Sequence, residues 1–289
     1  MANLKEVRTR IASVTSTQQI TSAMKMVSAA KFRRAQVAIL GMRPYSQQLN
    51  QIIADIDVED GVQTPYHEVR KENKVLLVVV TSNKGLCGAF NANVIKEANA
   101  RIAYYKGRGS EVNLLTLGRR ATEMFSKQKG LIVESHDELL DNASFDNVAN
   151  LADSLMKQFC DKKWDKIELL YNQFKNSLTQ VLTTEQFLPV KINAGGKDGS
   201  EKRNDYIYEP NKEEILQEMT PLTLRSQFYR AILDSLASEH GARMNAMQSA
   251  TDNAQALLSE LKLSYNKARQ AAITNEIIEI VSGSEALKG

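Results

Sequence analysis

Two stretches of this sequence are too long, as helices, for any compact domain. Residues 3–56 contain one Gly and one Pro. At about 1.5 Å per residue, forty residues of helix already form a rod of about 60 Å. The rod begins with the repeat of a coiled coil, since apolar residues alternate at spacings of three and four: Leu4, Val7, Ile11 and Val14. The N-terminal stretch therefore predicts a long helix that needs an equally long partner.

After Val14 the same register meets Gln18, Thr21 and Lys25, which are polar. A displaced apolar stripe starts at this point, as an insertion in the heptad pattern would produce: Ile20, Met24 and Val27. We expect the helix to change its buried face here.

A second helical stretch, from about Asn211 to Ser282, supplies the partner. From His240 onward, steps of three and four residues predict a seam of mainly small side chains: Arg243, Met247, Ala250, Ala254, Leu257, Leu261, Ser264, Ala268, Ala271, Asn275 and Ile278. Small residues let helices approach closely but bury less apolar surface than Leu. We expect residues 15–36 to pack antiparallel against residues 244–280.

Two helices bury only one face each, so some apolar side chains must remain outside the seam. The residues that cannot all face inward are Met24, Met26, Phe32, Ile277 and Val281. We expect part of this surface to serve partners.

The middle of the chain follows a different pattern. The run KVLLVVVTS at residues 74–82 is apolar and β-branched, as a strand buried on both faces requires. EVNLLTLG and GLIVES repeat the strand signal, with helical patterns at residues 91–105 and 145–164. Alternating strands and helices predict a Rossmann-like α/β domain with a parallel sheet. Residues 166–190 predict an antiparallel hairpin turning at 175–177, and residues 193–206 a loop.

The sequence thus predicts an α/β domain plus a long antiparallel coiled coil formed by the two termini. Its expected parts are an N-terminal coiled-coil helix at 1–58, the α/β domain at 74–192, and a C-terminal helix at 211–289 that pairs with the first.

Charge and cysteine content narrow the possible functions. From Met1 to Arg43 there are eight Lys or Arg and one acidic residue, Glu6, so this end is strongly basic. Few aromatic residues interleave with these charges, which favours an acidic protein partner over nucleic acid. Cys87 and Cys160 lie far apart without metal-site spacing and predict free thiols. No apolar run is long enough to span a bilayer, and the first residues lack the apolar core of a signal peptide.

The segment TSNKGLCGAF, residues 81–90, follows a strand and precedes a helix, where Gly85 and Gly88 would be able to cradle a phosphate. Its spacing fits neither the Walker A pattern nor the dinucleotide fingerprint, so we interpret it as a structural turn. The three His residues are scattered, and no nucleophile or metal motif occurs. We therefore expect no catalytic residue, no cofactor and no metal.

Three segments together resemble the gamma subunit family of F-type ATP synthases, the central stalk of a rotary motor. They are RIASVTSTQQITSAMKMVSAAKFRRAQ, TSNKGLCGAFNANV and SEHGARMNAMQSATDNAQALLSELKLSYNKARQAAITNEIIEIVSGSEAL. The resemblance covers almost the whole chain, and the C-terminal segment is the most specific. The regulatory insertion of chloroplast relatives is absent and no presequence precedes Met1, so we expect a bacterial protein.

The resemblance implies a non-catalytic axle inside a ring of alpha and beta subunits, within a proton-transporting ATP synthase. It implies contact with that ring at eight positions: Met24, Lys25, Met26, Arg269, Gln270, Thr274, Glu276 and Glu279. It also implies that the α/β domain meets the epsilon subunit and the c-subunit ring at the cytoplasmic face of the inner membrane. The chain would then reach the membrane only through the complex.

Two other classes of protein also match the residue patterns. One is a nucleotide-binding α/β enzyme with a helical dimerisation arm, and the other is a coiled-coil adaptor. Nucleotide bound to the isolated chain would favour the first, whereas neighbouring genes for alpha and beta subunits would argue against both.

Overall fold

A computed structural model describes residues 4–60, 64–128, 130–190, 209 and 211–286. The chain forms two compact units, Met1–Ser28 with Met244–Gly289, and Ala29–Arg243. Two long helices, α1 (Leu4–Asp60) and α5 (Lys212–Ala286), contribute to both units. The division at 1–58, 74–192 and 211–289 stays a prediction, and the expected loop at 193–206 lies outside the described residues.

The larger unit, Ala29–Arg243, is built on a five-stranded sheet with the order β3-β2-β1-β4-β5. Four strands are parallel and β5 runs antiparallel to β4, as predicted. Their bounds are β1 (Lys74–Val80), β2 (Glu111–Leu117), β3 (Ile132–Ser135), β4 (Lys166–Phe174) and β5 (Gln180–Leu188). Strand β1 lies at the centre and six of its seven residues are buried, which explains its continuous apolar sequence.

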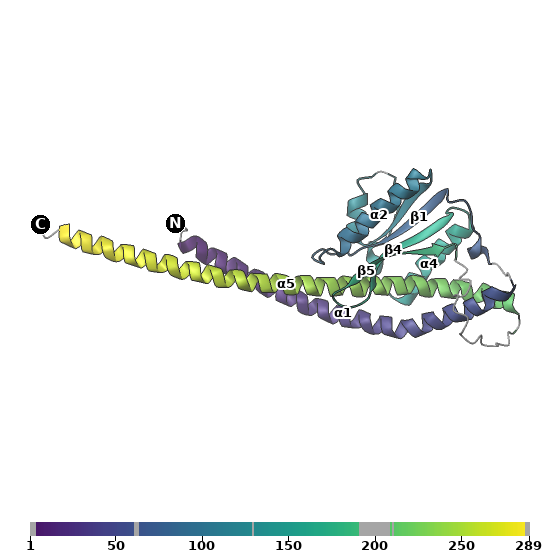
Figure 1. Ribbon diagram of the computed structural model, residues 1–289, viewed down its shortest axis with the longest axis horizontal. Helices are drawn as coiled ribbons and strands as arrows, with labels where there is room; N and C mark the ends of the chain where they lie inside the picture. The colour runs from purple at the N-terminus through teal and green to yellow at the C-terminus, as the bar shows by residue number, and fades with distance from the viewer. Residues whose placement is uncertain (1–3, 61–63, 129, 191–208, 210, 287–289) are drawn as a thin grey trace. The chain divides into compact units, whose positions relative to one another are not determined.

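Helices cover both faces of this sheet (Figure 1). α2 (Phe90–Gly107) and α3 (Arg119–Phe125) pack on the face that carries Val75, Leu77 and Val79. α4 (Phe145–Cys160) and one stretch of α5 pack on the other, against Leu76 and Val78. Two short 3-10 helices, η1 (Pro65–His67) and η2 (Asp137–Leu140), lie in the connections. The α/β prediction is confirmed, including every expected strand.

α5 and α1 also pack together within this larger unit. Ile39 of α1 forms a buried cluster with Leu233 and Ala237 of α5 and with Phe174 at the end of β4. The rings of Phe32 and Phe174 meet edge to face, with 5.5 Å between centroids. The same stretch of α5 therefore contacts the sheet and α1.

The smaller unit is a helical hairpin, formed by residues 4–28 of α1 and 244–286 of α5. Gln18 Nε2 donates to Gln255 Oε1 at 2.6 Å, and Thr251 Oγ1 donates to Thr21 Oγ1 at 2.9 Å. Because the α1 residue number rises as the α5 number falls, the helices are antiparallel, as Figure 1 shows. The predicted antiparallel pairing of the two termini is confirmed.

The expected change of face in α1 is wrong. Thr21 and Ser28 are buried, whereas Ile20 and Val27 are 59% and 58% exposed. The original heptad register continues because its polar side chains are satisfied: Thr21 Oγ1 donates to Gln18 O, and Ser28 Oγ donates to Met24 O. Satisfied hydroxyl groups can be buried at low cost.

The predicted seam of α5 needs a similar correction. Met247, Ala254, Leu261 and Ala268 are buried or half-buried, as expected, but Leu258 is buried and Leu257 is 39% exposed. The buried side includes Thr251, which bonds to Thr21. Counted from Met247, the spacing of buried residues is therefore four and then three, rather than the predicted three and then four. Ala271, Asn275 and Ile278 are exposed.

Two further expectations concern thiols and membrane spans. Cys87 is a buried free thiol and Cys160 a half-buried one, as predicted. Among the described residues, no helix combines the length and apolar character that crossing a bilayer requires.

Gly118, directly after β2, provides a test of the sheet packing. Its φ is +102°, and a Cβ there would lie 2.3 Å from the Thr81 carbonyl oxygen. Gly109 has a φ of +81° but open space around it. We expect Gly109→Ala to cost about 1–2 kcal/mol, the left-handed penalty alone. Gly118→Ala adds a backbone clash and should cost about 3–5 kcal/mol.

Urea unfolding followed by the fluorescence of Trp164, which is buried on the α4 side of the sheet, measures both variants. Equal losses in the two alanine variants would show that the contact with Thr81 does not constrain Gly118.

Candidate functional site

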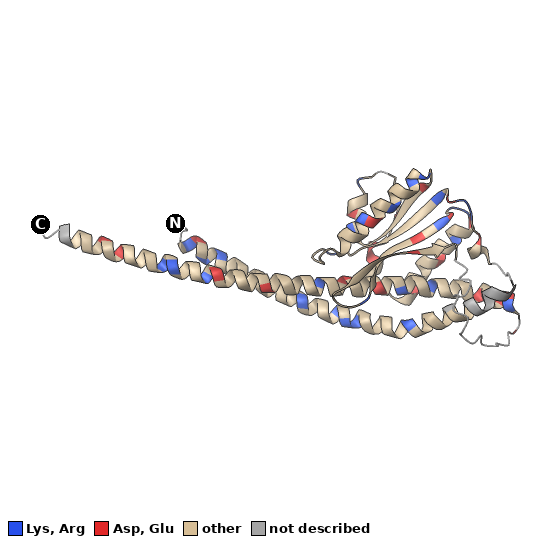
Figure 2. Cartoon of the chain, viewed as in Figure 1, with Lys and Arg blue, Asp and Glu red and all other residues tan. Residues whose placement is uncertain are grey.

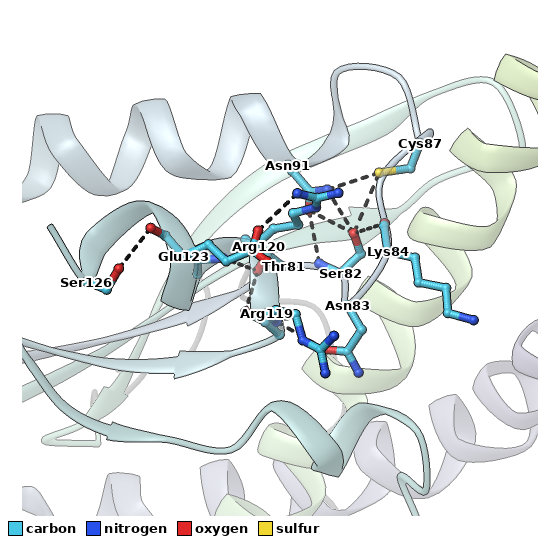
Figure 3. Close-up of polar contacts among 12 residues, drawn as sticks. Thr81, Ser82, Asn83, Lys84, Cys87, Asn91, Arg119, Arg120, Glu123 and Ser126 are labelled. Atoms are coloured by element: carbon cyan, nitrogen blue, oxygen red, sulfur yellow. Dashed lines mark hydrogen bonds and ion pairs between the residues drawn. The ribbon is translucent and has the colours of Figure 1, made fainter.

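The TSNKGLCGAF segment forms a turn at the carboxyl end of β1, and its polar groups bond largely to one another (Figure 3). Ser82 Oγ donates to Lys84 O at 2.7 Å, and Ser82 N donates to Asn91 Oδ1 at 2.9 Å. Asn91 Nδ2 contacts Cys87 Sγ at 3.2 Å. Leu86 and Gly88 adopt positive φ values of 62° and 61°, which produce the sharp reversal.

Arg243 of α5 holds this turn from the other side. Its guanidinium donates to the carbonyl oxygens of Lys84 at 2.7 Å and Gly85 at 3.2 Å. The same guanidinium pairs with Glu239 at 2.6 Å, and both side chains are only 9% exposed. Burial raises the pKa of Glu239, while the charge of Arg243 opposes that shift. Arg243, which its ion pair with Glu239 holds in place, therefore fastens the turn to α5 through these two carbonyl oxygens.

His240, beside this pair, is held neutral. Burial lowers its pKa to about 4, and the positive charges of Arg243 and Lys31 act in the same direction. At neutral pH the His240 imidazole therefore adds no positive charge beside Arg243. Among the described residues, no group of three His, Cys, Asp or Glu side chains is placed to hold a metal ion.

The five predicted contact residues of α5 lie on a segment that no α1 residue faces. The register set by the Gln18–Gln255 bond brings Leu4, where α1 begins, level with about Arg269. Figure 1 shows α5 continuing past the end of α1. Residues 269–284, called the free segment below, are all exposed. It contains Arg269, Gln270, Thr274, Glu276 and Glu279.

The three predicted contact residues of α1 lie elsewhere on the hairpin. Met24 and Lys25 are half-buried beside the seam, and Met26 is 64% exposed. By the same register Met24 is level with about residue 248. About twenty residues of helix, or roughly 30 Å, separate that level from Arg269. The structure thus places the predicted residues in two bands rather than in one site.

Exposed apolar side chains other than the predicted contact residues stand out in both bands, and Ile277 and Val281 among them were expected to lie outside the seam. Ile20 and Val27, which we expected in the seam, project from α1 with more than half of their surface exposed. On the free segment, apolar residues at steps of four, three and one form one face of the helix: Ile273, Ile277, Ile280 and Val281, 48–65% exposed. The seven-residue spacing of Ile20 and Val27 indicates that they share one face of the helix. It does not indicate whether that face is buried in the seam or exposed.

The two helices of the hairpin also differ in charge (Figure 2). Residues 4–28 of α1 carry Lys5, Arg8, Arg10 and Lys25 against one acidic residue, Glu6. Such a basic strip attracts acidic surfaces at a distance of about one Debye length, roughly 8–10 Å in physiological salt.

Sequence comparisons identify the family. The family described as "ATP synthase" matches residues 3–287. The ATP synthase gamma chain of Flavobacterium johnsoniae is 52% identical over the full length of both chains, and that of Cytophaga hutchinsonii is 49% identical over 99% of each. The chain belongs to the ATP synthase gamma chain family. Gamma chains of this similarity are found here in bacteria, which agrees with the expected bacterial type.

Solved gamma-like structures have the same fold. The central stalk and c-ring structure of the mitochondrial ATP synthase of Tetrahymena thermophila matches with a TM-score of 0.59 and 27% identity, over 80% of this chain and 99% of that one. A chain of the Euglena gracilis mitochondrial enzyme matches with a TM-score of 0.71 and 20% identity, over 98% and 94%. The enzyme and adaptor alternatives are not favoured by these relationships.

The Arg243–Glu239 pair gives a test of how the gamma-chain turn is held. Arg243→Met leaves the Glu239 carboxylate buried without its cation, and should destabilise the larger unit by about 3–5 kcal/mol. Adding Glu239→Gln removes the stranded charge and should restore more than half of that loss. Trp164 fluorescence in urea measures each variant, and additive losses in the double variant would contradict the pairing.

Proposed function

We propose that this gamma chain is the non-catalytic rotary shaft of an F-type ATP synthase, turning within a ring of alpha and beta subunits. The observation that carries the proposal is the free segment, a helix exposed on all sides with an apolar face of Ile273, Ile277, Ile280 and Val281. An isolated helix of this length is marginal in water, and exposed apolar faces normally find a partner. A surrounding ring supplies such a partner.

The contacts proposed with the ring are the two bands of the hairpin. The first band is the free segment, which offers polar groups from Arg269, Gln270, Thr274, Glu276 and Glu279. The second band lies on α1 and consists of Met24, Lys25 and Met26. A two-helix shaft has no threefold symmetry, so three beta subunits meet three different faces. A partner shifts a conformational equilibrium only through such differential contact.

The proposal also covers the α/β part of the larger unit and the cellular location of the complex. We assign the α/β part to contacts with the epsilon subunit and the c-subunit ring, at the cytoplasmic face of the bacterial inner membrane. The solved Tetrahymena structure that resembles this chain contains a central stalk with a c-ring, which supports this assignment. The chain then couples ion flow to ATP synthesis or hydrolysis performed by other subunits.

The free segment is tested by the double substitution Arg269→Ala with Gln270→Ala. An Arg contact shielded from water is worth about 1.5–3 kcal/mol, enough to bias one beta conformation about tenfold or more. We expect the complex to assemble, while ATP hydrolysis and ATP-driven proton pumping fall several-fold. The matched control is Lys127→Ala with Gln128→Ala, an exposed neighbouring pair in the sheet unit. Normal turnover in an assembled Arg269/Gln270 variant would show that these side chains make no functional contact with the ring.

The absence of a catalytic role is tested on the isolated full-length chain. Because the turn at residues 81–90 is closed by its own hydrogen bonds and by Arg243, we expect no micromolar ATP binding by calorimetry. A tagged chain should instead co-purify with a stoichiometric ring of nucleotide-binding subunits. Tight nucleotide binding by the chain alone, or purification without that ring, would contradict the shaft assignment.

A further inference from the structure

A polar cavity of about 330 Å³ lies in the larger unit. It opens between the C-terminal half of α2 and the strands β4 and β5, and its lining is almost wholly polar. The charged and aromatic groups around it are Glu72, Arg101, Tyr104, Arg108, Lys166 and Glu168. The proposed shaft function does not use this cavity.

Glu168 is the unusual group in the lining. Its side chain is only 6% exposed, and one carboxylate oxygen, Oε1, accepts from the Tyr105 hydroxyl at 2.6 Å and faces Lys166 Nζ at 3.2 Å. The other oxygen, Oε2, is buried and has no hydrogen-bond partner among the described residues. Arg101 Nη1 stands 4.0 Å from it, beyond hydrogen-bond reach. A buried carboxylate oxygen of this kind calls for a donor.

The remaining groups at the cavity need the opposite kind of partner. Arg101 and Arg108 bring guanidinium groups with several N–H donors each. Arg108 uses one donor on the Tyr104 hydroxyl, and Arg101 uses Nε on Glu97 Oε1 at 3.0 Å. Lys166 is already held by Glu72 at 2.8 Å and by Glu168. Burial and the bond to Glu168 raise the pKa of Tyr105 to about 12, so its hydroxyl stays a donor to Oε1. The cavity therefore presents many donors together with one buried acceptor, Glu168 Oε2, that has no hydrogen-bond partner among the described residues.

A ligand that fits must accept several hydrogen bonds and donate one from the same small group. Sulfate and phosphomonoester dianions only accept, whereas monohydrogen phosphate carries three acceptor oxygens and one P–OH. Three cations and two carboxylates line the cavity, and a third carboxylate, that of Glu97, pairs with Arg101 from outside the lining. An anion would therefore be held by the hydrogen-bond donors of the lining rather than by a net positive charge. We propose that this cavity binds inorganic monohydrogen phosphate, with its P–OH donating to Glu168 Oε2 and its other oxygens accepting from Arg101 and Arg108.

Three dianions of similar shape separate this proposal from simple charge attraction. Inorganic phosphate, methyl phosphate and sulfate are titrated into the full-length chain at pH 8 and constant ionic strength, with binding followed by calorimetry. At that pH methyl phosphate has lost its acidic proton, because the second pKa of a phosphomonoester is about 6. We expect phosphate to bind at least tenfold more tightly than the other two. Equal binding of all three dianions, or no binding of phosphate at millimolar concentration, would overturn the proposal.

Two variants connect the selectivity to named atoms. Glu168→Gln replaces the acceptor by an amide that also donates, so sulfate and methyl phosphate should gain affinity until the preference for phosphate disappears. Arg108→Gln, on an exposed residue whose guanidinium contacts Tyr104, should weaken phosphate binding about tenfold. Arg119→Gln, an exposed arginine of α3 outside the cavity, is the control and should change nothing. Unchanged phosphate affinity in Arg108→Gln would refute the site even if Glu168→Gln does not fold.

Discussion

The packing of one stretch of α5 onto the sheet is the interaction on which the larger unit depends. Leu224, Phe228, Ala231 and Ile232 are at most 2% exposed and close the face of the sheet that α4 covers only in part. Burying a Leu, Ile or Phe side chain contributes about 1.5–3 kcal/mol. Because α5 runs without interruption to Ala286, the helix that completes the core of the larger unit is also one of the two helices of the hairpin. A central stalk thereby gains a shaft whose base is part of a folded domain.

The buried part of α5 also contains more polar groups than a simple core helix. Asp234, Ser238, Glu239 and Arg243 are all below 10% exposed. Burial raises the pKa of Asp234 to about 6, although Arg230 and Arg43 pull it down. Buried ionic groups add little net stability, yet they penalise any arrangement that separates them. We infer that they fix the rotation of α5 against the sheet and the turn at residues 81–90, where apolar contacts alone would allow sliding.

Most of the architecture could be predicted from periodicity, and the errors have a common physical origin. Strand β1 was evident because burial on both faces requires an unbroken apolar run. The long helices were evident because Gly and Pro are few in them. The register was mistaken at Thr21 and Thr251 because apolar spacing does not indicate polar residues, and a hydrogen bond between two hydroxyl groups joins the helices there. The polar cavity was not foreseen, since Arg101 and Glu168 come from a helix and a strand 67 positions apart. Only the packing of α2 over β4 brings them together.

The hairpin seam contains small and polar side chains that contribute little to the stability of helix pairing. On the proposed function, this suits a shaft that works inside a ring. Thr21, Ser28 and Ala254 bury little apolar surface, so pairing of the two helices alone contributes little stability. Apolar side chains of greater size, among them Ile20, Val27 and Ile277, face outward instead. These outward side chains are available for burial against a partner. On the proposed function, the ring then stabilises the shaft that turns within it. The small side chains of the seam let the two helices pack closely, which keeps the shaft narrow.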